Sequence, residues 1–143
     1  MSRRKKKVAL EEQANTLNEQ IAETVAGLVY MSESDASIIA FAGQQADSVT
    51  SETVLLQIGK SNDLKIEVNG FDDFFAPLIK MQKWFGEDER KMTEKFVQLK
   101  ELLKTNLIQK KVLRIGKKEI DIFVVGLDSE NILRGIQTKA TET

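Results

Sequence analysis

The stretch that most constrains the fold lies near the end of the chain, at residues 120–127, and reads IDIFVVGL. Apolar residues follow one another there with little alternation, whereas a strand with one face in water alternates apolar and polar positions. The run therefore predicts a strand that is covered on both faces. Helices elsewhere in the chain must supply the two covers, which favours a three-layer arrangement.

The residues around this run predict a C-terminal meander. The stretch KVLRIGKKEIDIFVVGL reads as two strands around a turn at Gly116-Lys117. A second turn at DSEN is followed by a third strand, ILRGIQTKAT. We therefore expect an α+β fold, namely a three-layer α/β/α sandwich with a mixed, largely antiparallel sheet.

Two apolar stripes at helical spacing predict the covering helices, over roughly residues 8–29 and over residues 87–107. The second has three acids at its start and lysines toward its end, an arrangement that suits the helix dipole. The first stripe consists of Leu10, Ala14, Leu17, Ile21, Val25 and Leu28, and the second of Met92, Phe96, Leu99, Leu103 and Leu107.

Shorter elements are predicted between these two helices. The local patterns indicate a strand over 37–43, a short helix within 48–60, a strand over 64–70 and a packed irregular connection with a helical turn over 71–86. Thr50 or Ser51 is the expected cap of the short helix, and Gly59 is expected to end it.

Histidine and cysteine are both absent from the chain. Without histidine the usual general base near neutral pH and the commonest metal ligand are missing. Without cysteine the chain has no disulfide and no thiolate metal site, and Ser-His and Cys-His nucleophile pairs are excluded as well. Glycine-rich phosphate loops are also missing. The sequence therefore favours a protein that is not an enzyme and that uses no cofactor.

Several polar or aromatic sites invite a functional interpretation. Adjacent acids at 72–73 and 87–89 suit a divalent cation, but a turn and helix-start charge explain them better. The stretch MSESD (31–35) predicts a helix stop and a turn, with Glu33 and Asp35 on a surface loop. Trp84 is the only tryptophan and precedes an acidic helix start. A core residue and an interface anchor are both open readings for it.

Charge is distributed unevenly along the chain. Residues 1–7 contain five of the 21 basic side chains and no acid, so the remainder, with 16 basic and 22 acidic side chains, has a net charge of −6. We expect a basic disordered arm over 1–7 and a single domain over 8–143. The arm is either a solvated tail or, through residues 3–7, a weak contact for nucleic acid or an anionic membrane. The acidic body suits a basic protein partner better than a nucleic acid.

The start of the chain does not read as an export signal. Its basic segment is followed by only three apolar residues, VAL, before two glutamates. No apolar run approaches the roughly 20 residues that a membrane span requires. The sequence therefore predicts a cytoplasmic location.

Taken together, the motifs resemble those of the nuclease A inhibitor family over roughly residues 10–143. The matching pieces occur in the family's order and at near family spacing. They are MSESD, FF at 74–75, KWFGEDE before the long helix, LKTNL after it, VLRIGKKEIDIFVVG and the closing LRGIQTKATET.

The resemblance implies a small cytoplasmic α/β/α protein that binds and blocks a metal-dependent, sugar-non-specific nuclease of the ββα-metal type. It also implies that Glu33, Trp84 and Thr143 make much of the contact with the nuclease. The hydroxyl and terminal carboxylate of Thr143 would reach the partner's catalytic Mg²⁺, for which such oxygens are preferred ligands. A second hypothesis is a binding or scaffold module of the same fold that contacts RNA or a membrane through its basic arm.

Overall fold

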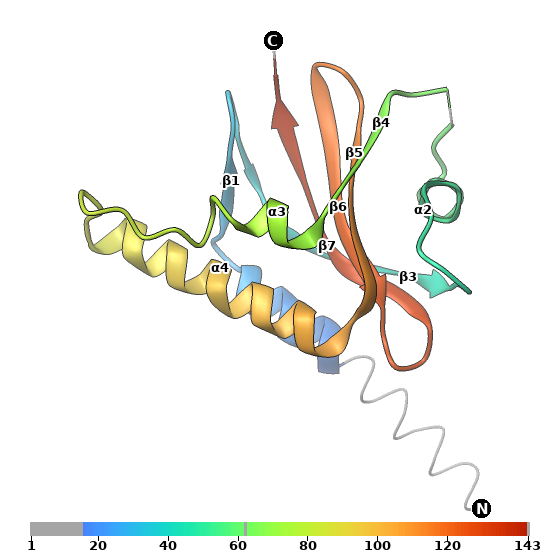
Figure 1. Cartoon of the computed structure of the whole chain (residues 1–143), viewed down its shortest axis with the longest axis horizontal. Helices are drawn as coiled ribbons and strands as arrows, with labels where there is room; N and C mark the ends of the chain where they lie inside the picture. Colours follow the sequence, from blue (N-terminus) through green and yellow to red (C-terminus); the bar gives the residue numbers. More distant parts are fainter. Residues whose placement is uncertain (1–15, 62, 143) are drawn as a thin grey trace, which may run out of the picture.

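A five-stranded antiparallel sheet forms the middle layer of the molecule (Figure 1). The structure is a computed structural model that describes residues 16–61 and 63–142. The strand order is β3-β7-β6-β5-β4. The strands are β3 (Ile39–Gln45), β4 (Ile66–Asn69), β5 (Ile108–Ile115), β6 (Glu119–Leu127) and β7 (Ile132–Thr141).

The α+β class and the C-terminal meander are confirmed, because β5, β6 and β7 are consecutive both in sequence and in the sheet. The expectation of a mixed sheet was wrong for the described strands, since all of their pairings are antiparallel. The physical reason lies in the connections. β3 and β4 lie at opposite edges of the sheet, beside β7 and β5, so the connection through α2 does not place them side by side as a parallel pair.

Strand β6 is covered on both faces, as its apolar run predicted. Alternate side chains enter two different hydrophobic clusters, because successive residues of a strand point to opposite faces. Ile120, Ile122 and Val124 belong to one cluster, and Phe123, Val125 and Leu127 to the other. Helices pack on both clusters, so the three-layer arrangement is confirmed.

The first cluster is covered by the helix over residues 16–25 together with α3 (Phe71–Phe75) and α4 (Glu87–Asn106). The second is covered by α2 (Ser51–Ile58). Figure 1 shows α3 and α4 on one side of the sheet and α2 on the other. None of the helices in the described part of the chain is long and apolar enough to cross a membrane.

The ends of the helices follow local sequence signals. Thr50 caps α2 by accepting a hydrogen bond from the Thr53 amide at 3.1 Å, and Gly59 ends it in a left-handed conformation. The first helix ends at residue 25 rather than 29, because Gly27 adopts a φ of 80° and β1 begins at Val29. The predicted start of that helix, at residues 8–15, lies outside the described residues.

The stretch between the first helix and β3 is a hairpin that the sequence did not predict. β1 (Val29–Met31) pairs antiparallel with β2 (Asp35–Ser37), and Tyr30 lies opposite Ala36. Asp35 is therefore a strand residue, and its assignment to a surface loop was wrong. The reason is that the pairing of β1 with β2 extends up to Asp35 and leaves only three residues for the turn.

Candidate partner-binding surface

The turn of the β1–β2 hairpin consists of Ser32, Glu33 and Ser34. The Ser32 hydroxyl donates to the Ser34 carbonyl at 2.7 Å and lies 3.4 Å from the Ser34 amide. Serine hydroxyls commonly stabilise turns by such local bonds. Glu33 lies at the middle of the turn and is exposed, as expected. The turn thus presents a carboxylate on a short, internally bonded loop.

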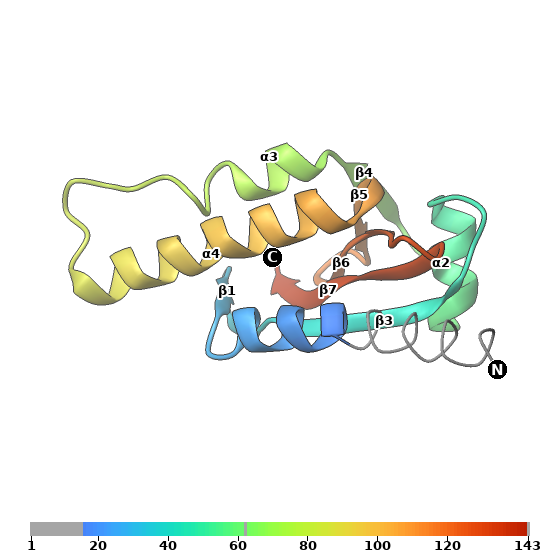
Figure 2. The same ribbon diagram turned by 90° about the horizontal axis from the view of Figure 1, so that it is seen from below.

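The same turn is bonded to the end of β7. The Thr141 amide donates to the Ser32 hydroxyl at 3.0 Å, and the Ser34 and Thr141 hydroxyls are 2.7 Å apart. The Glu33 amide also donates to the Thr141 carbonyl, at 3.4 Å. Figures 1 and 2 both show the hairpin beside the C-terminal part of β7. The fold therefore brings Glu33 to the strand that leads to Thr143.

The end of β7 is also held from its other side. Thr141 lies opposite Glu119 of β6, and the Glu142 amide donates to the Lys118 carbonyl at 2.8 Å. The Glu142 carboxylate forms an ion pair with Arg114 of β5. Residue 142 is the last described residue, so the predicted contact residue Thr143 lies outside the described residues.

Trp84 lies in the loop between α3 and α4 and is 74% exposed. Its ring packs edge-on against Phe85, with 4.6 Å between the ring centroids. This exposure excludes the core reading that the sequence left open. An open groove of about 360 Å³ lies in the same region, lined by Met81, Gln82, Lys83 and Arg90.

The structure does not gather all the predicted contact residues at one point. The loop between α3 and α4 projects at one end of the molecule in both views, apart from the hairpin and the end of β7 (Figures 1 and 2). A partner that contacts both regions must therefore span the face between them. An interface of standard size involves about 20–30 residues on each side.

A family comparison decides what this arrangement belongs to. The family model described as nuclease A inhibitor-like protein matches residues 15–143. The chain belongs to the nuclease A inhibitor-like family. The matched range includes the hairpin, the Trp84 loop and all of β7. A comparison with curated proteins found no match.

Sequence reasoning missed Ser32, Ser34 and Thr141 as parts of this surface. The two serines flank the glutamate of the family's motif, and Thr141 is in its closing segment. The sequence did show that all three side chains have a hydroxyl group and can form hydrogen bonds. The bond between Ser32 and Thr141 joins residues 109 positions apart, however, and no local pattern indicates such a pair.

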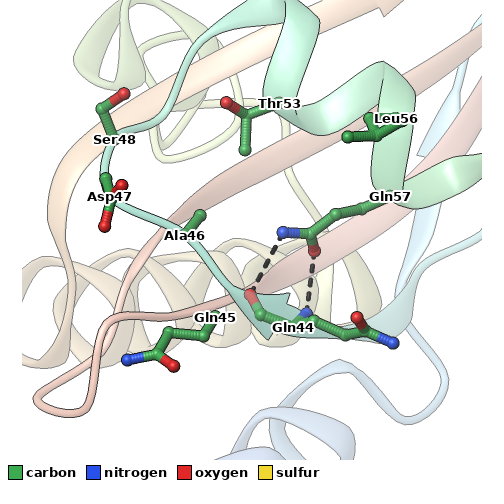
Figure 3. A pocket seen from close by; sticks show the side chains of 8 residues that line it. All are labelled: Gln44, Gln45, Ala46, Asp47, Ser48, Thr53, Leu56 and Gln57. Carbon is green, nitrogen blue, oxygen red and sulfur yellow. Dashed lines mark hydrogen bonds between the residues drawn. The ribbon is translucent and has the colours of Figure 1, made fainter.

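Another hollow, of about 460 Å³, lies between β3 and α2 in this member of the family (Figure 3). Five of its eight lining residues have a side-chain amide or hydroxyl. The Gln57 amide bonds both backbone groups of Gln44, accepting from the N–H at 2.8 Å and donating to the carbonyl at 3.2 Å. Since β3 is an edge strand among the described strands, Gln57 occupies groups that would otherwise be open to another chain. The Gln57 side chain that lines this hollow is therefore best explained as protecting the edge of β3 from pairing with another strand.

The acidic clusters are explained by the helices that contain them. Asp72 and Asp73 lie in the first turn of α3, and Asp72 pairs with Lys100 of α4 at 3.5 Å. Glu87 pairs with Lys91 at 3.3 Å, one turn along α4. Within residues 16–61 and 63–142, no group of three or more acidic side chains is placed to hold a metal ion.

Proposed function

We propose that this chain inhibits a metal-dependent, sugar-non-specific nuclease of the ββα-metal type by covering its active site. Membership of the nuclease A inhibitor-like family supports a nuclease as the partner and a role other than catalysis. The observation that carries the proposal is the bonding of the Glu33 turn to the end of β7. It places an exposed carboxylate beside the strand that leads to Thr143.

Electrostatics supports the choice of partner. A nuclease must hold a polyanion, so its cleft is basic. The chain beyond residue 7 has a net charge of −6 and is attracted to such a cleft, which raises the association rate. Within the complex we expect Glu33 to pair with an arginine of the cleft. The basic arm at 1–7 lies outside the described residues, and its weak contact with nucleic acid stays a prediction.

Thr143 is proposed as the group that reaches the partner's catalytic Mg²⁺. Carboxylate and hydroxyl oxygens are ligands that Mg²⁺ prefers, and they would take positions otherwise open to a scissile phosphate and water. Thr143 follows the bonded residue Thr141 by two positions, a span of at most about 7 Å. A short tether from a fixed strand end limits where the terminal oxygens are found.

Trp84 is proposed as the second anchor of the interface. A tryptophan that is exposed in the free protein offers a large apolar area for burial against a partner, and such residues dominate many interfaces. The contribution of Trp84 to binding stays a prediction. The cytoplasmic location expected from the sequence also stays a prediction.

The test is an inhibition assay against a panel of ββα-metal nucleases. At least one nuclease should lose its DNA cleavage activity when mixed with an equimolar amount of this protein. A panel in which every nuclease stays active at a large molar excess of the protein would refute the inhibitor function. The chain would then be a binding or scaffold module that keeps the family fold.

A further inference from the structure

We infer that Ser32, Ser34 and Thr141 are positioning residues that hold the Glu33 turn and the end of β7 as one unit. We call this set of three residues the clasp. The inference rests on the proposed function, because it assigns these residues a role in presenting Glu33 and Thr143 to the nuclease. The clasp residues themselves need not touch the partner.

The clasp replaces strand pairing at the place where pairing ends. β7 pairs with β3 only between Ile132 and Gln137, so its last residues have no partner strand on that side among the described strands. The hairpin bonds to them through single groups instead. The Thr138 hydroxyl donates to the Ser37 carbonyl at 2.9 Å, and the Thr141 amide donates to the Ser32 hydroxyl at 3.0 Å. These bonds satisfy backbone groups that would otherwise need water.

Both sides of Glu33 take part in the clasp. Ser32 accepts from the Thr141 amide, and the Ser34 hydroxyl lies 2.7 Å from the Thr141 hydroxyl. The backbone of Glu33 is therefore fixed relative to Thr141 from two directions. A contact surface that is ordered before binding loses less conformational entropy on association. Loss of the clasp should therefore weaken binding even though Glu33 and Thr143 remain in the chain.

The first arm of the test measures affinity for an inhibited nuclease. Ser34→Ala and Thr141→Val each remove one partner of the hydroxyl pair, and each should weaken binding about threefold to tenfold. The double variant should bind no more weakly than the weaker single variant, because both changes remove the same bond. Ser34→Thr keeps a hydroxyl at this position and should restore the affinity.

Thr138→Val is the matched control for Thr141→Val. It makes the same chemical change on the same strand and removes a bond to the same hairpin, but at Ser37 rather than at the clasp. Its affinity should stay within about twofold of that of the unchanged protein, about the scatter expected for sites without coupling. Equal losses of affinity for Thr138→Val and Thr141→Val would overturn the inference. Strictly additive losses in the double variant of Ser34→Ala and Thr141→Val would overturn it as well.

The second arm uses the free protein and needs no nuclease. Ser32→Ala removes the acceptor of the Thr141 amide, so hydrogen exchange at that amide should become faster while the amides of 133–136 keep their rates. An unchanged Thr141 exchange rate would refute the clasp. If the unchanged protein binds no nuclease of the panel, the proposed function fails, and this exchange measurement alone still decides whether the clasp exists.

Discussion

Substitutions of exposed side chains on the candidate surface should affect binding and leave the stability of the fold nearly unchanged. Trp84 contacts Phe85 at one edge and has 74% of its surface in water, while Glu33 lies in an exposed turn. Truncating an exposed side chain changes the stability of the fold little. If a partner buries that side chain in the complex, the same truncation weakens binding. Variants at these positions therefore report on the interface and not on the fold.

We expect Trp84→Ala to cost at least about 2 kcal/mol of binding to the nuclease, the size of a hot-spot residue. The melting temperature should stay close to that of the unchanged protein, because little of the side chain is buried. A binding titration and a thermal melt check both parts. Leu56→Ala is the control, since Leu56 is 83% exposed on α2, on the other face of the sheet, and should leave affinity unchanged. If the Trp84→Ala variant binds with full affinity, Trp84 is not part of the interface.

Glu33→Gln keeps the size of the side chain and removes its charge. If Glu33 pairs with a buried arginine of the nuclease, the change should cost roughly 2–5 kcal/mol, largely through faster dissociation. Surface plasmon resonance measures the two rates separately. Glu52→Gln, on the first turn of α2, is the matched control and should alter dissociation little. Equal dissociation rates for the two variants would contradict an ion pair at Glu33.

At the scale of elements, the turn between β6 and β7 depends on a buried charge pair. Asp128 accepts hydrogen bonds from the amides of Glu130 and Ile132, at 2.8 and 3.0 Å. Its second oxygen lies 2.8 Å from Arg134 Nε, and both residues are buried. The predicted turn at 128–131 is thus closed by one carboxylate that joins the loop to the following strand.

Asp128→Ala should destabilise the fold by about 3–5 kcal/mol, because it leaves the Arg134 charge buried without its partner. Urea unfolding monitored by circular dichroism gives the free energy of unfolding. Glu87→Ala breaks an exposed pair with Lys91 and should cost less than about 1 kcal/mol. Similar losses for the two variants would show that burial does not govern the strength of these pairs.

Strand β7 approaches β6 closely at Gly135, which has a φ of 157°. A Cβ atom added there would lie 1.9 Å from the Val124 carbonyl oxygen, so the two backbones would have to separate. Gly135→Ala should therefore cost more than the about 1–3 kcal/mol that an unfavourable backbone conformation alone costs. Gly59→Ala is the comparison, since that glycine has a φ of 71° but no atom within 4 Å of the added Cβ. Chemical unfolding of both variants should rank Gly59→Ala as the milder change.

At the scale of the whole molecule, the sheet determines where the proposed contact elements lie. β7 runs between β3 and β6, so its position is set by pairing along both edges before it reaches the clasp. Tyr30 of the hairpin packs against the cluster that contains Ile136 and Ala140 of β7 and the buried residues of the helix over 16–25. The end of β7 therefore takes its position from the full three-layer fold.

Adding one glycine after Thr143 tests the proposed role of the chain end. The extension moves the terminal carboxylate by about 3.8 Å, which exceeds the tolerance of Mg²⁺ ligand distances near 2.0–2.1 Å. We expect weaker inhibition with an unchanged melting temperature, since an added terminal residue contributes little to a core. The loss should shrink when the nuclease is stripped of metal with EDTA. Equal affinities of the extended and original chains in Mg²⁺ would refute the metal contact.

Much of the fold was predictable from sequence because its signals are local. The apolar run over 120–127 predicted a strand covered on two faces, and the stripe on α4 predicted the helix that covers one of them. Thr50 and Gly59 marked the ends of α2. The motifs that resemble the family indicated the membership that the family model shows. Periodicity and capping depend on neighbours within a few residues, so a single chain displays them.

The tertiary structure alone decided how distant residues pair. Which surfaces pack together decides three features that the sequence left open. These are the antiparallel sense of the edge strands, the exposure of Trp84 and the buried Asp128–Arg134 pair. The bond between Ser32 and Thr141 joins residues 109 positions apart, which no period or cap encodes. The amino-acid sequence by itself indicated the family and most of the elements, but not the β1–β2 hairpin. Packing determined which of the candidate contact residues lie together, because contact between distant residues exists only once the layers have assembled.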